Sequence, residues 1–139
     1  MRKGMLAGAY WRVKPGKAAK GAVLYTGAVA GEAHAAHARL ADDGLGLLAV
    51  TSADRLYRDW RVRGDKSHIA RLLSDVSPDA RLVTVQDGHP AALSWIGSVT
   101  GHRVRALGVD AFGQCGDVSD LYRAYGIDAD AIEAAFRGF

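Results

Sequence analysis

The sequence contains one cysteine, three prolines and no long run of apolar residues in its 139 positions. A single cysteine, Cys115, excludes an internal disulfide, and nothing in the cysteine content indicates an oxidising compartment. Because no stretch of about 18 apolar residues is present, the sequence offers no membrane-spanning helix. The basic first residues are not followed by an apolar segment, which argues against a signal peptide. These absences predict a cytoplasmic protein without a membrane partner.

The overall composition is that of an ordinary globular domain. Hydrophobic residues make up 49% of the chain and charged residues 24%, which is close to the globular average. The length fits one domain with a sizeable core. The net charge of +3 and the pI of about 9.2 are only mildly basic. Such a weak excess does not by itself predict a nucleic-acid partner.

Apolar segments and breaks divide the chain into an arm and an alternating α/β region. Residues 1–20 form the predicted N-terminal arm, in which 9–13 is a possible edge strand. Residues 21–139 form the predicted domain, where short apolar strands alternate with helical patterns. The predicted strands are 22–25, 47–50, 82–85 and 104–109. This alternation predicts a mainly parallel sheet covered on both faces, with the arm strand added antiparallel at one edge.

Local signals place the helix ends. Thr51 or Ser52 is the expected cap of a helix that stops at the polar segment 61–66. The next helix is expected to end at Pro78. Two short helices close the chain, with Asp117 and Asp128 as their expected caps.

Polar residues at the carboxyl ends of the predicted strands are the first candidates for a ligand site. Asp87 and His89 flank a glycine just before Pro90, and an acid near a histidine can hold a proton or a metal. The simpler interpretation makes Asp87 a helix cap and His89 a loop residue, and we prefer it because two such residues do not make a site. The full set of candidate ligand or interface residues is Asp87, His89, Arg55, Asp110, Phe112 and Gln114.

Other reactive side chains are weaker candidates. His34 and His37 lie three apart on a predicted helix, but a zinc site needs a third protein ligand that the pattern does not supply. We therefore expect no metal site. Cys115 stands in a glycine-flanked loop before a helix, yet a free and unreactive thiol is the simpler interpretation. The loop has neither the GxGxxG nor the P-loop pattern.

A basic segment interleaved with aromatic residues favours a protein interface. The segment 55–66 contains four arginines and one lysine, together with Tyr57 and Trp60. Arginine and aromatic residues are enriched at protein interfaces, and acidic residues interrupt the basic run. RNA binding is a weaker alternative. A further alternative is a free-standing module that holds a small anion or nucleotide through the strand-end loops and Arg55.

Four segments, in order, resemble parts of one known domain. They are TGAVAGEAHAAHARLADDG (26–44), AVTSADRLYRDW (49–60), VTVQDGHPAALSWIGSV (83–99) and GVDAFGQCGDVSDLYRAYGIDADAI (108–132). Together they resemble the C-terminal domain of transketolase-like, thiamine-diphosphate enzymes, and most of all that of the homodimeric pyruvate dehydrogenase first component. The arm resembles the segment that joins the middle domain of such enzymes to this one.

The resemblance implies a three-layer α/β/α fold with a five-stranded, mostly parallel mixed sheet. It implies a parent enzyme that uses thiamine diphosphate and magnesium and acts on 2-oxo acids or ketose sugars. The cofactor motifs of that family belong to its N-terminal and middle domains, so the resemblance implies no cofactor and no catalytic residue in this chain. The expected role is a scaffold and dimerisation domain, with the missing domains and a second copy as partners.

Overall fold

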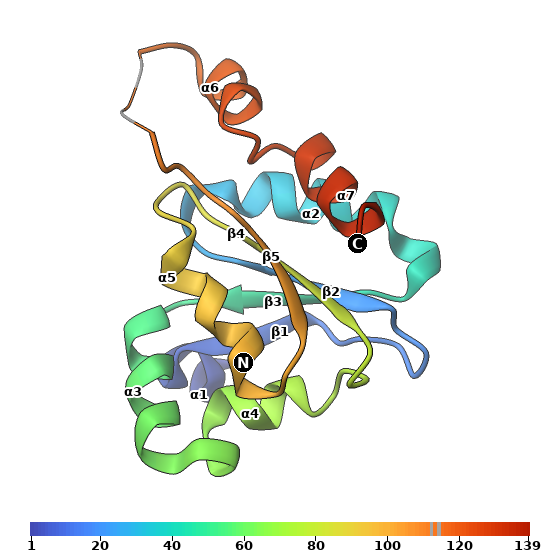
Figure 1. Cartoon of the computed structure of the whole chain (residues 1–139), viewed down its shortest axis with the longest axis vertical. Coiled ribbons are helices and arrows are strands. Elements are labelled where there is room, and N and C mark those ends of the chain that lie inside the picture. Colours follow the sequence, from blue (N-terminus) through green and yellow to red (C-terminus); the bar gives the residue numbers. More distant parts are fainter. Residues whose placement is uncertain (112, 114) are drawn as a thin grey trace.

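A five-stranded mixed sheet forms the centre of the molecule (Figure 1). The computed structural model describes residues 1–111, 113 and 115–139. The strands are β1 (Ala9–Val13), β2 (Gly21–Tyr25), β3 (Gly46–Val50), β4 (Arg81–Val85) and β5 (Arg103–Leu107). They lie in the order β1-β3-β2-β4-β5. β1 pairs with β3 antiparallel and every other pair is parallel, so the predicted antiparallel edge strand is confirmed.

Helices cover both faces of this sheet, which confirms the predicted α/β/α fold (Figure 1). The helices are α1 (Arg2–Ala7), α2 (Ala30–Arg39), α3 (Ala53–Arg63), α4 (His68–Leu73), α5 (Ala91–Ser94), α6 (Val118–Ala124) and α7 (Ala129–Arg137). Short 3-10 turns are η1 (Gly27–Val29), η2 (Ala41–Asp43), η3 (Gly64–Lys66) and η4 (Trp95–Val99). α2 and α7 lie on one face, and α3, α4 and α5 lie on the other.

Two hydrophobic clusters fill the space between the helices and the sheet. Successive side chains of a strand point to opposite faces of the sheet, so Val23 of β2 packs in one cluster and Leu24 in the other. Every residue of β2 and β3 is buried, because these central strands are covered on both faces. The edge strand β5 is only partly covered, and Arg103 and Arg105 are exposed. The core therefore lies around β2, β3 and β4, and polar residues collect at the sheet edges.

Side-chain caps begin three of the helices. Ser52 Oγ accepts a hydrogen bond from the N–H of Arg55 at 3.3 Å, which places the start of α3 at the second of the two predicted caps. Ser67 Oγ accepts one from Ala70 in the same way, and Asp128 Oδ1 accepts one from Ala131 at 2.9 Å. Asp117 stands at the cap position of α6 but makes no capping hydrogen bond within the described residues.

Three local expectations differ from the structure. The arm begins with α1, which the sequence pattern did not indicate because none of its residues is buried. α3 continues through the polar segment to Arg63, since arginine is a good helix former and this face is solvated. α4 ends at Leu73, several residues before Pro78. No helix in the described ranges is long and apolar enough to cross a membrane.

Candidate functional site

The carboxyl ends of β2 and β4 meet at the predicted ligand edge. Gly27 follows β2 in a left-handed conformation, with φ of +76°. A Cβ atom on this glycine would lie 2.8 Å from Oδ1 of Asp87, which follows β4. Asp87 therefore stands directly at the β2 turn, and its carboxylate is exposed.

His89, and not Asp87, makes a side-chain hydrogen bond with the start of α5. The N–H of Ala91 donates to Nδ1 of His89 at 3.2 Å, and the buried side-chain amide of Gln86 donates to the carbonyl oxygen of His89. These hydrogen bonds occupy His89 with the start of α5. The hydrogen bond at the start of α5 was expected from Asp87, and His89 makes it instead.

α6 approaches this edge from above, at the top of Figure 1. Burial raises the pKa of the Tyr122 phenol on α6, and the negative charges of Asp87 and Glu32 raise that pKa further. Glu32 in turn accepts a hydrogen bond from the N–H of Ala129 at 2.8 Å. The carboxylates at this edge therefore interact with the Tyr122 phenol of α6 and with the first backbone N–H of α7.

The structure describes two of the remaining predicted residues, Arg55 and Asp110. Arg55 lies on α3 and lines a hollow of about 400 Å³ with Ser52, Asp54 and Arg58. Asp110 is exposed after β5. Phe112 and Gln114 lie outside the described residues. A common ligand site for the six candidates stays a prediction.

The two helix histidines have separate partners. His34 Nε2 lies 3.3 Å from the hydroxyl of Tyr25, and His37 Nε2 lies 2.8 Å from the carbonyl oxygen of Leu45. Among the residues that the structure describes, no three His, Cys, Asp or Glu side chains gather closely enough to hold a metal ion.

An aromatic surface joins α3 to the segment after β4. It consists of Tyr57, Trp60 and Trp95, and we call these three residues the aromatic surface. The rings of Trp60 and Trp95 stack with centroids 5.4 Å apart, and Tyr57 meets Trp95 edge-on at 5.1 Å. An adjoining hollow of about 550 Å³ is lined by Tyr57, Trp95, Ala53, Asp54, Ala91 and Ala92.

Arginines surround this surface. Arg61 lies over the ring of Tyr57, 5.9 Å from its centroid, and donates to its hydroxyl. Arg58 pairs with Asp54 at 2.8 Å. The basic segment of the sequence is thus a solvated helix face beside the exposed ring of Tyr57 and the half-buried rings of Trp60 and Trp95.

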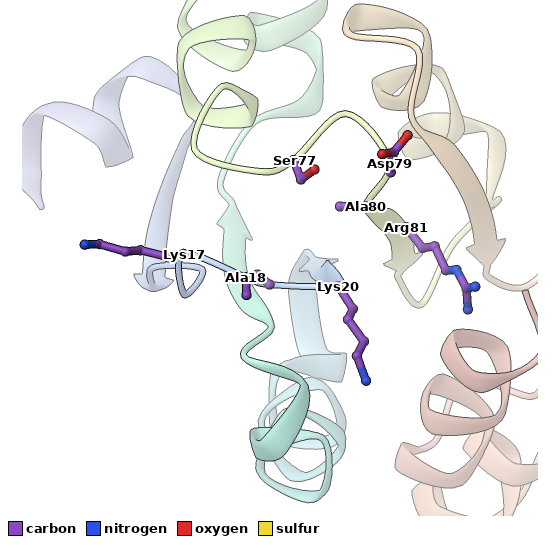
Figure 2. Close-up of a pocket in the computed structure, with 8 residues that line it drawn as sticks. Lys17, Ala18, Lys20, Ser77, Asp79, Ala80 and Arg81 are labelled. Carbon is purple, nitrogen blue, oxygen red and sulfur yellow. The ribbon is translucent and has the colours of Figure 1, made fainter.

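A further hollow lies at the opposite, amino edge of the sheet (Figure 2). It measures about 570 Å³ and is lined by residues 17–20, by Ser77 and by residues 79–81. Figure 2 shows the side chains of Lys20 and Arg81 extending in similar directions from neighbouring strand starts, whereas Lys17 points away from them. Sequence reasoning missed this hollow because it considered only carboxyl ends. The available signal was a basic residue at or just before the start of β2, β4 and β5.

Three arginines gather next to this hollow. Arg81, Arg103 and Arg105 lie over the ring of Phe139, at 5.6, 5.5 and 5.2 Å from its centroid, and we call them the arginine cluster. Arg105 also donates to the carbonyl oxygen of Gly138 at 2.5 Å. None of the three makes an ion pair within the described ranges.

Comparison with known proteins finds similarity at the level of the fold. No protein-family model matches the sequence, and no curated protein matches it. Transketolase from Leishmania mexicana is similar in structure, with a TM-score of 0.71 and 16% identity, over 98% of this chain and 18% of that chain. Transketolase from Campylobacter jejuni gives a TM-score of 0.70 and 20% identity, over 96% of this chain and 19% of that one.

A further similar structure is described as a split-gene transketolase, an inactive beta4 tetramer. Its TM-score is 0.60 at 19% identity, over 93% of this chain and 41% of that chain. This chain spans less than a fifth of the length of the transketolases from Leishmania mexicana and Campylobacter jejuni. It has the fold of the transketolase C-terminal domain.

Proposed function

We propose that this chain acts as the non-catalytic C-terminal domain of a thiamine-diphosphate enzyme of the transketolase type. The observation that carries the proposal is the coverage: 98% of this chain matches only 18% of a transketolase chain. In this proposal the domain packs against the other domains of the enzyme, supports them and contributes to dimerisation. The proposal includes a cytoplasmic location for the chain and its parent.

Thiamine diphosphate and magnesium belong, in this proposal, to the N-terminal and middle domains of the parent. The described residues of this chain do not gather into a ligand set for the metal, so no step of the reaction is assigned to them. The parent acts on ketose sugars or 2-oxo acids. The finer hypothesis, from the sequence resemblance, is a pyruvate dehydrogenase first component.

The aromatic surface is the proposed contact with those other domains. Tyrosine, tryptophan and arginine dominate the binding energy of protein interfaces. Tyr57 is 38% exposed although it lies beside two indole rings, and the adjoining hollow is lined largely by apolar side chains. A partner side chain that entered the hollow would bury apolar surface, and the arginine rim would favour acidic groups around it.

Self-association is the second part of the proposal. The neighbouring apolar side chains of Met5 and Leu6 on α1 are 45% and 65% exposed. Contiguous apolar surface on an isolated domain favours association. The similar split-gene chain is described as an inactive tetramer, which is consistent with a subunit that needs its partners for activity. We expect a homodimer of this chain in solution.

Co-purification tests the proposed contact. The chain is expressed with the thiamine-diphosphate-binding domains encoded in the same or a neighbouring reading frame, and the complex is measured by size-exclusion chromatography. Tyr57→Ala should weaken the complex at least about tenfold, as for a hot-spot residue. Val62→Ala, on another side of the same helix, is the matched control and should leave it unchanged. Equal effects of the two substitutions would reject the aromatic surface as the contact.

A further inference from the structure

We propose that the amino edge of the sheet binds a small ligand that carries two or more phosphate groups. The site combines the hollow between residues 17–20 and 77–81 with the arginine cluster, and Arg81 belongs to both. This site lies at the opposite end of the parallel strands from the predicted ligand edge, and it does not depend on the proposed function.

The register of the sheet sets like charges side by side. Arg81 is the direct partner of Arg103 on the neighbouring parallel strand, and Arg105 lies two residues further along, on the same face. Like charges on adjacent strands destabilise a sheet. The three guanidiniums share one ring, so they lie within about one Debye length of each other at 0.1 M salt, ~10 Å. The fold therefore concentrates positive charge that its described acidic residues do not neutralise.

The hydrogen-bonding capacity of the cluster is also largely unused. Each guanidinium carries five N–H donors in a planar fork. Arg105 donates to Gly138, but the side chains of Arg81 and Arg103 make no hydrogen bond to a described residue. The Phe139 ring supports the guanidiniums by cation–π contact and leaves their N–H edges available. Free guanidinium forks are the groups that best match phosphate oxygens.

The hollow extends the positive surface toward Lys20. Its volume of about 570 Å³ lies within the usual range of small-ligand sites, roughly 300–1,000 Å³. Lys20 is held by Asp43, with Nζ and Oδ1 2.6 Å apart, and Asp79 lies on the rim. These carboxylates partly offset the lysines, so the arginines carry most of the attraction. Because the cations are spread over both the hollow and the cluster, a ligand with several phosphates fits them better than a single phosphate.

The walls of the hollow are fixed by the fold. The N–H of Arg81 donates to the carbonyl oxygen of Lys20 at 3.0 Å, which ties the two segments together. The buried His102 donates from Nε2 to the carbonyl oxygen of Ser77 at 2.9 Å. A site held in this way loses little conformational freedom on binding.

Titration with sodium tripolyphosphate tests the proposal, with backbone amide NMR shifts and calorimetry as readouts at constant ionic strength. Saturable binding with shifts at residues 17–20, 77–81 and 103–105 is expected. Arg81→Gln and Arg103→Gln should each weaken binding about tenfold or more. Arg2→Gln removes the same charge from exposed α1 and is the control, which should bind as the wild type does. Asp43→Asn frees Lys20 and should bind more tightly.

Matched titrations with pyrophosphate and ADP identify the source of the phosphates. Equal affinity supports recognition of the phosphates alone, and tighter binding of ADP supports the same site with an added nucleoside contact. Absence of saturable binding, shifts confined to other residues, or equal binding by Arg103→Gln and Arg2→Gln would overturn the proposal. Melting temperatures of the variants at or above that of the wild type would show that weaker binding is not a loss of folding.

Discussion

The indole rings of Trp60 and Trp95 stack 5.4 Å apart with their planes inclined by 21°. The pair joins α3 to η4 across the surface of one helical layer. Stacked aromatic pairs contribute about 0.5–1.5 kcal/mol beyond the area that they bury. The aromatic surface is therefore already assembled before any partner arrives, and Tyr57 lies against both rings.

Removing the Trp60 ring should destabilise the fold as well as the surface. Trp60→Ala is expected to lower the free energy of unfolding by about 2–3 kcal/mol, because it removes a half-buried ring and its stacking. Trp60→Phe keeps an aromatic ring at the position and should cost less than about 1.5 kcal/mol. Urea unfolding followed by circular dichroism measures both. Equal losses for the two variants would contradict a role for the ring stack.

Gly21 should be irreplaceable for steric reasons. A Cβ atom at this position would lie 2.1 Å from the carbonyl oxygen of Arg81 and 2.7 Å from the Phe136 ring. Gly21→Ala should therefore cost several kcal/mol, on the order of 3 or more, or prevent folding. Gly31→Ala is the contrast, since nothing lies within 4 Å of its added methyl group.

Helix propensity predicts that Gly31→Ala stabilises the fold, whereas Gly21→Ala destabilises it. Gly31 lies within α2, where alanine is favoured over glycine by roughly 0.5–1 kcal/mol. Thermal unfolding of Gly31→Ala should show a raised melting temperature, and that of Gly21→Ala a strongly lowered one. The same sign for the two substitutions would show that the packing around β2 is not as described.

Glu32 should hold α7 against α2. Its carboxylate accepts the N–H of Ala129, in the first turn of α7, at 2.8 Å. Glu32→Ala should lower the free energy of unfolding by about 1–2 kcal/mol, because a helix N-terminus loses both a hydrogen bond and a negative charge. Glu32→Gln keeps an acceptor and should lose less. Chemical denaturation measures the free energy of unfolding of both variants. A value for Glu32→Ala equal to that of the wild type would contradict a stabilising contact between Glu32 and α7.

The Lys20–Asp43 pair predicts a dependence of stability on acid. The hydrogen bond from Lys20 holds the pKa of Asp43 below its ordinary value of 3.8. The charged carboxylate of Asp43 therefore stabilises the fold fully at pH values above the ordinary pKa. This stabilisation is lost as the pH falls through the lowered pKa of the folded state. Asp43→Asn should lower the melting temperature near pH 7 and have little effect near pH 2. An equal effect at both pH values would show that the pair does not titrate in this way.

The sequence predicted the strands better than the ends of the helices and the surfaces between them. β2, β3 and β4 begin within one residue of the predicted positions, because short apolar runs between turn signals are local features. The last strand ends at Leu107 rather than at residue 109, since the N–H of Val109 donates to the carbonyl oxygen of Gly88, beyond the end of β4. The helix α1 was missed because it has no buried face to produce a periodic pattern.

Long-range contacts account for the rest. Nothing local to Phe139 indicates that its ring lies under Arg81, Arg103 and Arg105, because strand order and register decide that contact. His89 was expected to be a loop residue, and the hydrogen bond that its ring accepts from Ala91 depends on the geometry of one turn. Asp87 was noted at a strand end, but only the pairing of β2 with β4 makes it a neighbour of Gly27.

The role that we propose for this chain is support of a thiamine-diphosphate enzyme without turnover of its own. The decisive experiment is sedimentation velocity of the purified chain mixed with the cofactor-binding domains, combined with turnover of pyruvate and of ketose phosphates. We expect a stable mixed complex that is active with thiamine diphosphate and magnesium, while the chain alone gives no turnover. Turnover by the chain alone, or no association at micromolar concentration, would rule out this role.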